Sequence, residues 1–125
     1  MTTAVWCVLI AAVLPYAFTG LAKFGGKGRY DNRAPRDYLE RLDGWRKRAH
    51  WAQLNSFEAF PPFAAGVLIA QQLGAPQAHV DLLATAFVAV RVAYGALYLL
   101  DSPRLRSTAW ALGMVCVIGL FVAAT

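Results

Sequence analysis

Four long stretches without charged side chains cover most of this 125-residue chain. They are residues 1–22, 59–80, 82–100 and 107–125, and a single charged residue, Arg91, interrupts the third. A helix that crosses a bilayer needs about 20 mostly apolar residues. The stretches are continuously apolar and do not alternate between apolar and polar residues, which favours spanning helices over a membrane barrel. The pattern predicts an all-α protein.

Composition supports the same class. Hydrophobic residues make up 58% of the chain and charged residues 15%, whereas about 25% of an ordinary soluble domain is charged. Lys23 follows the first apolar stretch instead of preceding it, so we expect a retained helix and not a signal peptide. We predict a single domain, residues 1–125, that forms an integral membrane four-helix bundle of antiparallel up-down order. Its helices are expected at about 2–23, 45–73, 77–100 and 103–124.

Basic residues are concentrated on one side of the expected bundle. Nine of the twelve Lys and Arg fall in residues 23–48, two more lie where the third helix is joined to the fourth, and the loop near Gly74 has none. By the positive-inside rule, we expect the basic loop 23–48 to be cytoplasmic and both termini to lie on the opposite side. Acidic residues interleave with the basic ones, which disfavours nucleic acid as a partner. They are Asp31, Asp37, Glu40 and Asp43.

The ends of the expected helices have ordinary chemical signals. Residues 23–42 are expected to form a partly ordered loop. Asp43 and Ser102 are suited to cap the helices that follow them. Gly74 and Pro76 mark the turn between the second and third helices.

Two charged residues, Glu58 and Arg91, fall deep inside the expected membrane helices, away from their ends. Glu58 lies well inside the second helix, and Arg91 lies ten residues before Asp101 at the end of the third, which places both at a similar depth. A lone charge near the bilayer centre costs about 2.5–3.5 kcal/mol on insertion scales. We therefore expect Glu58 and Arg91 to form a buried pair. Such a pair either fixes helix register or walls a polar ligand site, and both interpretations stay open at this point.

Polar and aromatic residues extend from this pair along both helices. Spacings of three and seven residues place the members of each set on one helical face. We expect the two faces to outline a cleft that opens to the cytoplasm. The sets are Arg48, Asn55 and Glu58 on the second helix, and Arg91, Tyr94 and Tyr98 on the third.

The start of the last helix carries Arg106 and Ser107. Helix N-termini present free N–H groups and the positive end of the helix dipole, so they favour anions. A guanidinium and a hydroxyl there could hold a carboxylate or stabilise a thiolate. Cys7 and Cys116 lie in apolar stretches without a neighbouring His or acid to activate them. We expect both cysteines to pack in the core, and no metal site.

The motifs of three helices resemble those of a known family. Residues 48–50 (Arg-Ala-His) and 55–61 (Asn-Ser-Phe-Glu-Ala-Phe-Pro) resemble the second-helix signature of the membrane-associated proteins in eicosanoid and glutathione metabolism, the MAPEG family. Residues 91–94, Tyr98 with Leu99, and Arg106 with Ser107 are similar to the later parts of that pattern. The resemblance covers essentially the whole chain. It is to small bacterial-type members, which implies the bacterial inner membrane.

The resemblance implies a homotrimer of four-helix protomers. Enzymes of this family bind glutathione as a cosubstrate between neighbouring subunits near the cytoplasmic side. They conjugate it to lipophilic electrophiles, reduce lipid peroxides or isomerise eicosanoid precursors, so membrane lipid and a lipophilic small molecule are the implied partners. The resemblance assigns glutathione binding to Arg48, Asn55, Glu58, Arg91, Tyr94 and Tyr98, and the catalytic place beside the sulfur to Arg106 and Ser107.

Two departures from the family pattern favour an alternative function. Leu54 stands where active members often carry an Arg, and Trp110 stands where a Tyr is frequent. The alternative is a non-catalytic membrane structural or accessory subunit. A small-molecule transporter is a further alternative. Small multidrug exporters, however, carry an unpaired Glu in the first helix, whereas Glu58 lies in the second and has Arg91 as a candidate partner.

Overall fold

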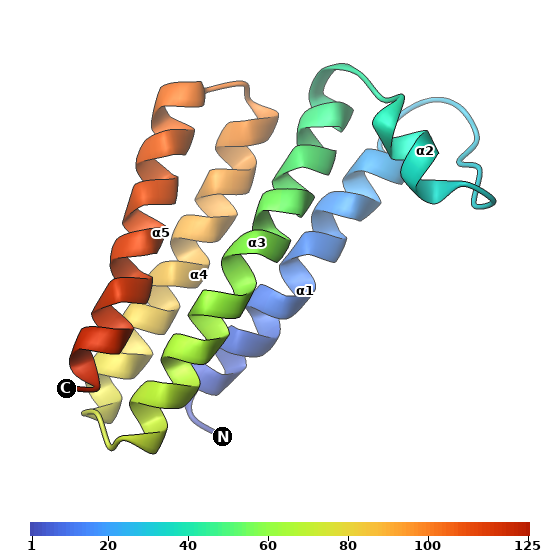
Figure 1. Cartoon of the computed structure of the whole chain (residues 1–125). Coiled ribbons are helices and arrows are strands. Elements are labelled where there is room, and N and C mark those ends of the chain that lie inside the picture. The colour runs from blue at the N-terminus through green and yellow to red at the C-terminus, as the bar shows by residue number, and fades with distance from the viewer.

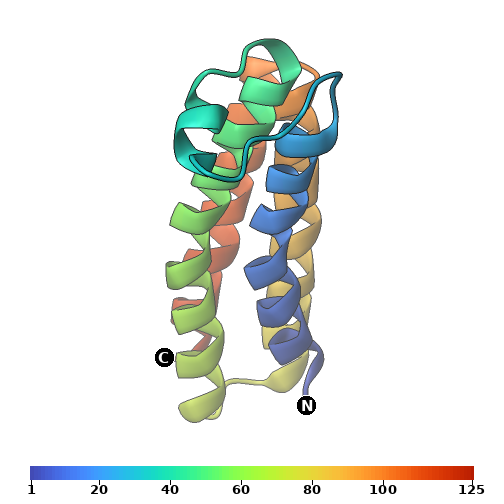
Figure 2. The same cartoon turned by 90° about the vertical axis from the view of Figure 1, so that its right-hand side faces the viewer.

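The computed structural model describes all 125 residues and contains five helices and no strands. The four long helices lie side by side, and the short α2 lies at one end of them (Figure 1). A view turned by 90° also places both chain termini at the end away from α2 (Figure 2). The predicted all-helical class is confirmed. The helices are α1 (Thr3–Phe24), α2 (Pro35–Glu40), α3 (Gly44–Gln72), α4 (Gln77–Leu99) and α5 (Pro103–Ala123).

Three of the helices, α1, α4 and α5, are long and apolar enough to cross a membrane. Only 26 of the 125 residues are buried, and large apolar side chains such as Leu9 and Val115 are exposed. An apolar exterior of this kind suits contact with lipid tails or other subunits, not with water. α3 has 29 residues, or about 44 Å of helix. It is not among the three candidates, and it carries a basic first turn and Glu58.

The core combines aromatic stacking with close helix approach. Phe63 of α3 stacks on Phe87 of α4, with ring centroids 3.9 Å apart and planes within 10° of parallel. Where α1 meets α4, Phe18 packs directly against Gly95. A Cβ atom at position 95 would lie 1.9 Å from the Phe18 ring. Only glycine leaves room for this ring, so Gly95 sets the distance between the two helices at this level.

Three consecutive basic residues at the start of α3 each hold the C-terminal end of another helix. Arg46 donates to two carbonyls of the last turn of α1, at 2.9 and 3.0 Å. Arg48 donates to two carbonyls at the end of α4, both at 3.1 Å. The ammonium of Lys47 donates to the carbonyls of Leu39 and Glu40, which end α2. The last carbonyls of a helix lack backbone partners and carry a partial negative charge, so cations stabilise them.

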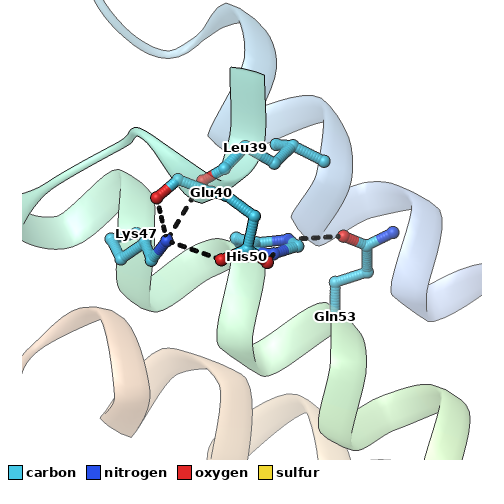
Figure 3. Close-up of polar contacts among 5 residues, drawn as sticks. All are labelled: Leu39, Glu40, Lys47, His50 and Gln53. Atoms are coloured by element: carbon cyan, nitrogen blue, oxygen red, sulfur yellow. Dashed lines mark hydrogen bonds and ion pairs between the residues drawn. The ribbon is translucent and has the colours of Figure 1, made fainter. Parts of the chain in front are cut away.

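The helix α2 lies where the sequence predicted only a partly ordered loop, and side chains dock it on α3 (Figure 3). Glu40 Oε1 lies 3.3 Å from His50 Nε2, and Glu40 Oε2 lies 3.4 Å from the Lys47 ammonium. The second ring nitrogen of His50 lies 3.2 Å from the side-chain oxygen of Gln53. Hydrogen bonds from His50 and Lys47 hold the pKa of Glu40 below its ordinary value. The six residues of α2 are too few to form a stable helix alone, so this docking stabilises it.

The helix ends lie at the residues that signal them, but the expected side-chain caps do not form. Asp43 and Ser102 occupy the N-cap positions of α3 and α5, and neither side chain accepts a hydrogen bond from the first turn. Gly74 adopts the left-handed conformation, with φ of 75°, in the turn between α3 and α4. Pro76 is the N-cap residue of α4.

Candidate functional site

Arg91 is the one Lys or Arg among the buried residues, with 3% of its surface exposed. Its Nη2 donates to Asn55 Oδ1 at 2.8 Å and to Ser56 Oγ at 3.3 Å, both on α3. The guanidinium carbon lies 4.1 Å from the centroid of the Tyr94 ring. A desolvated cation is stable only with such partners. These contacts therefore tie the middle of α4 to α3.

The expected direct pair between Glu58 and Arg91 does not form. Glu58 is exposed, and no ion pair joins it to Arg91. Asn55 lies between them, since its amide nitrogen donates to Glu58 Oε2 at 3.3 Å while its oxygen accepts from Arg91. Asn55 precedes Glu58 by three residues and so lies on the same helical face. An amide can serve both neighbours at once because it carries a donor and an acceptor.

A column of cations and aromatic rings leads from Arg91 to the start of α5. Tyr94 and Tyr98 meet edge to face with centroids 5.7 Å apart. The Arg106 guanidinium carbon lies 4.2 Å from the Tyr98 ring centroid. Tyr94 is 5% exposed, whereas Tyr98 and Arg106 are partly exposed. Six of the predicted residues thus form one continuous group: Asn55, Glu58, Arg91, Tyr94, Tyr98 and Arg106.

Asn55 and Glu58 lie between two cavities. The first has a volume of about 170 Å³ and lies among α3, α4 and α5. Its lining is mostly apolar, and it includes Phe87, Arg91, Trp110, Met114 and Val117. The second has a volume of about 370 Å³ and is lined by Trp51, Leu54, Asn55, Glu58, Tyr94 and Tyr98.

Three predicted site residues line neither of these cavities: Arg48, Arg106 and Ser107. Arg48 is bound to the end of α4 and lines a separate cavity with Asp43 and Asp101. Ser107 is exposed in the second turn of α5 and lines neither cavity beside Glu58. The shared helical face of Arg48 and Asn55 did not reveal this, because a long side chain is directed by the carbonyls within its reach.

The structure adds two residues that the sequence did not single out. Ser56 is 4% exposed, donates its hydroxyl to the carbonyl of Ala52 at 2.8 Å, and accepts from Arg91. Phe87 stacks in the core and also forms a wall of the first cavity. The only sequence signal for Ser56 was its place directly after Asn55. Helical periodicity alone assigns Ser56 to a different face of the helix from Asn55.

The arrangement presents two kinds of charge to a ligand. The Glu58 carboxylate, oriented by Asn55, can accept hydrogen bonds from an ammonium or amide group. The Arg106 guanidinium makes no side-chain hydrogen bond or ion pair in the protein, so it is free to pair with an anion beside the Tyr98 ring. No group of three or more His, Cys, Asp and Glu side chains is placed to hold a metal ion.

Comparisons with known proteins bear on the whole chain. No curated protein and no solved structure matches it. The family model described as the MAPEG family matches residues 3–125, which is nearly the full length. With three helices suited to crossing a membrane, this match shows an integral membrane protein. The chain belongs to the MAPEG family.

Proposed function

We propose that this protein is a glutathione-dependent transferase or peroxidase that acts on lipophilic electrophiles at the cytoplasmic side of the membrane. The observation that carries the proposal is the exposed Glu58 carboxylate, held by Asn55 and backed by the buried Arg91, between a mostly apolar cavity and a second cavity lined by aromatic and polar side chains. The family supports the same activity. Glutathione has an ammonium, two carboxylates and a thiol, and the site offers the Glu58 carboxylate for the ammonium and the Arg106 guanidinium for one anionic group.

The second cavity suits the peptide part of glutathione. Glu58 and Asn55 would receive its ammonium and amide groups, since a carboxylate and an amide oxygen accept hydrogen bonds. Tyr94 and Tyr98 supply ring surface against the backbone of the tripeptide. Arg91 acts from behind as a positioning residue for glutathione, because it is nearly fully buried and does not line this cavity.

The thiol would lie toward the start of α5. A free thiol has a pKa of about 8.5 and is mostly protonated at neutral pH. The unpaired cation of Arg106, with Ser107 one residue further, would favour the thiolate as nucleophile. In conjugation the thiolate sulfur forms a bond to an electrophilic carbon, and the leaving group departs with the bonding pair. The apolar cavity beside Trp110 is placed to accept the electrophile.

The topology and assembly form part of the proposal. We infer a four-helix antiparallel bundle in which α3 is the fourth spanning helix and the end with α2 is cytoplasmic, in a bacterial inner membrane. The capping of α1 and α4 by Arg46 and Arg48 supports α3 as an integral member of the bundle. A homotrimer would cover the exposed apolar faces and complete the glutathione site between subunits.

A non-catalytic accessory subunit is the second candidate. Leu54 is 44% exposed and lines the glutathione cavity at the place where an arginine would add a bidentate partner for a carboxylate. Its absence weakens the site for an anionic ligand. In a non-catalytic subunit, the hydrogen bonds of Arg91 would serve only to hold α4 against α3.

Calorimetry with glutathione distinguishes the two candidates. The purified trimeric protein in detergent should bind glutathione in the millimolar range or tighter, and the bound thiol should show thiolate absorbance in the ultraviolet. Glu58→Gln should weaken binding about tenfold or more, since it removes a charge-assisted hydrogen bond. Asp37→Asn, which changes an exposed carboxylate on α2, is the matched control. No heat of binding at millimolar glutathione would rule out the enzyme and leave the accessory subunit.

A further inference from the structure

A separate cavity lies at the end of the molecule where α4 joins α5. Its volume is about 450 Å³. Its lining includes two acids, two bases and an indole, from the start of α3 and from the α4–α5 turn: Asp43, Lys47, Arg48, Trp51 and Asp101. The proposed glutathione chemistry uses none of its charged side chains.

The bases of this cavity are largely engaged, whereas its acids are not. The Lys47 ammonium donates to the two carbonyls that end α2 and to the Glu40 carboxylate. Arg48 donates from Nε and Nη2 to the carbonyls that end α4, which leaves Nη1 free. Asp43 and Asp101 make no ion pair and no side-chain hydrogen bond. The cavity therefore offers two free carboxylates beside one partly free guanidinium.

The position of the cavity is that of lipid headgroups. The helices α4 and α5 are suited to crossing the membrane, so the turn that joins them lies at a membrane surface. Trp51 is 44% exposed beside the cavity, and tryptophan is enriched at the headgroup level of a bilayer. A lipid of the bilayer would therefore contact this cavity with its headgroup.

We propose that this cavity binds the headgroup of a phosphatidylethanolamine-type lipid. The ammonium lies between the carboxylates of Asp43 and Asp101, and the phosphate accepts hydrogen bonds from Nη1 of Arg48. A primary ammonium has three N–H donors for the two carboxylates. A choline headgroup has no N–H donor, and an anionic headgroup without an ammonium would bring a negative charge to two unpaired carboxylates. This proposal is independent of glutathione binding.

Native mass spectrometry of the full chain in detergent tests the proposal. The protein is titrated with phosphatidylethanolamine, phosphatidylcholine and phosphatidylglycerol of identical acyl chains. Phosphatidylethanolamine should bind about tenfold more tightly than either of the others, which corresponds to one charge-assisted hydrogen bond or more. Equal retention of the three lipids would overturn the proposal.

The double variant Asp43→Asn/Asp101→Asn should lose the preference for phosphatidylethanolamine. Asparagine keeps the fold of both positions, since it is a good N-cap residue and tolerates the left-handed φ of 56° at Asp101. Asp37→Asn is the control, because its carboxylate is exposed on α2 and pairs with Arg41 outside the cavity. A preference that survives in the double variant would contradict the assignment.

Competition with soluble phosphoethanolamine distinguishes a lipid headgroup from a free metabolite as the ligand. This experiment uses the wild-type protein, so it tests the proposal even if the double variant fails to fold. It carries the same ammonium and phosphate, so it should displace the lipid only at much higher concentration. Failure to displace at any concentration would overturn the headgroup site. Binding as tight as that of the lipid would identify a soluble ligand and contradict the lipid.

Discussion

Arg91 donates to the amide oxygen of Asn55 at 2.8 Å, and through this amide the buried guanidinium orients a carboxylate that it does not touch. The cation gains a hydrogen-bond partner in the interior, and the Glu58 carboxylate stays exposed at the cavities. In this chain of contacts, Arg91 and Asn55 stabilise the protein, whereas Glu58 is the member available to a ligand. Mutations can therefore separate the effect on stability from the effect on ligand binding.

Asn55→Leu should lower the free energy of unfolding by about 1–3 kcal/mol, because it removes a hydrogen-bond partner from a buried cation. Glu58→Gln should change it little, since the new side chain still accepts from Asn55. Unfolding by heat in detergent, followed by circular dichroism, measures both. A larger loss in Glu58→Gln than in Asn55→Leu would contradict the bridging role of Asn55.

Arg46→Ala and Arg48→Ala should each cost about 1–3 kcal/mol of stability. Each removes two hydrogen bonds from a charged group to the last carbonyls of a neighbouring helix, and the attraction to that helix dipole. Arg36→Ala is the matched control, because Arg36 is exposed and pairs with no side chain. The same melting experiment reports all three variants. Equal melting temperatures for the capping and control variants would show that the caps add nothing.

Gly95→Ala should destabilise the protein by about 1–3 kcal/mol through overpacking, because the new methyl group would overlap the Phe18 ring. Phe18→Leu in the same chain should recover part of the loss. Gly20→Ala in α1 is the control, since nothing lies within 4 Å of a Cβ there and alanine favours the helix. A double-mutant cycle of unfolding free energies measures the coupling. Additive effects of the two substitutions would contradict direct contact.

The docking of α2 should weaken in acid. The pKa of Glu40 is lowered in the folded protein, first by the hydrogen bond to His50 and then by Lys47. Because the pKa of Glu40 is lower in the folded protein, its ionised carboxylate stabilises the docked state at pH values above the unfolded pKa of glutamate, about 4.3. This stabilisation is lost as the pH falls through the folded pKa of Glu40. Hydrogen exchange of the α2 amides should therefore accelerate below about pH 4.3, after correction for the intrinsic rate.

Glu40→Gln is the control for this acid transition. It should show faster exchange in α2 near neutral pH and no further change in the acid window. Asp31, whose pKa is also lowered, accepts from Arg33 outside α2, so the readout must be local to α2. An acid transition that persists in Glu40→Gln would assign it to another group.

Much of the fold was readable from the sequence, because membrane helices leave a strong signal. A helix in lipid satisfies its own backbone, so its position depends on a run of apolar residues and little else. Turn residues such as Gly74 and Pro76 mark helix ends through their own backbone preferences. The helix α2 escaped prediction because its stability comes from Glu40 contacts with residues that follow it in α3.

The candidate site was readable in part. Three- and seven-residue spacings identify Asn55 with Glu58, and Arg91 with Tyr94, because residues at such spacings share a helical face. They do not tell which side chains meet across helices. The predicted pair of Glu58 with Arg91 was wrong because Asn55 lies nearer to the guanidinium and can bond both groups.

The sequence by itself determined the all-helical class, the suitability for a membrane and the family, since each depends on composition or on local patterns along the chain. The tertiary structure decided the partners of the charged residues. Arg48 reaches the end of α4, Arg91 reaches Asn55, and Glu58 remains exposed. Long polar side chains choose among the partners that packing brings within about 3 Å. That choice is made only when the helices have come together.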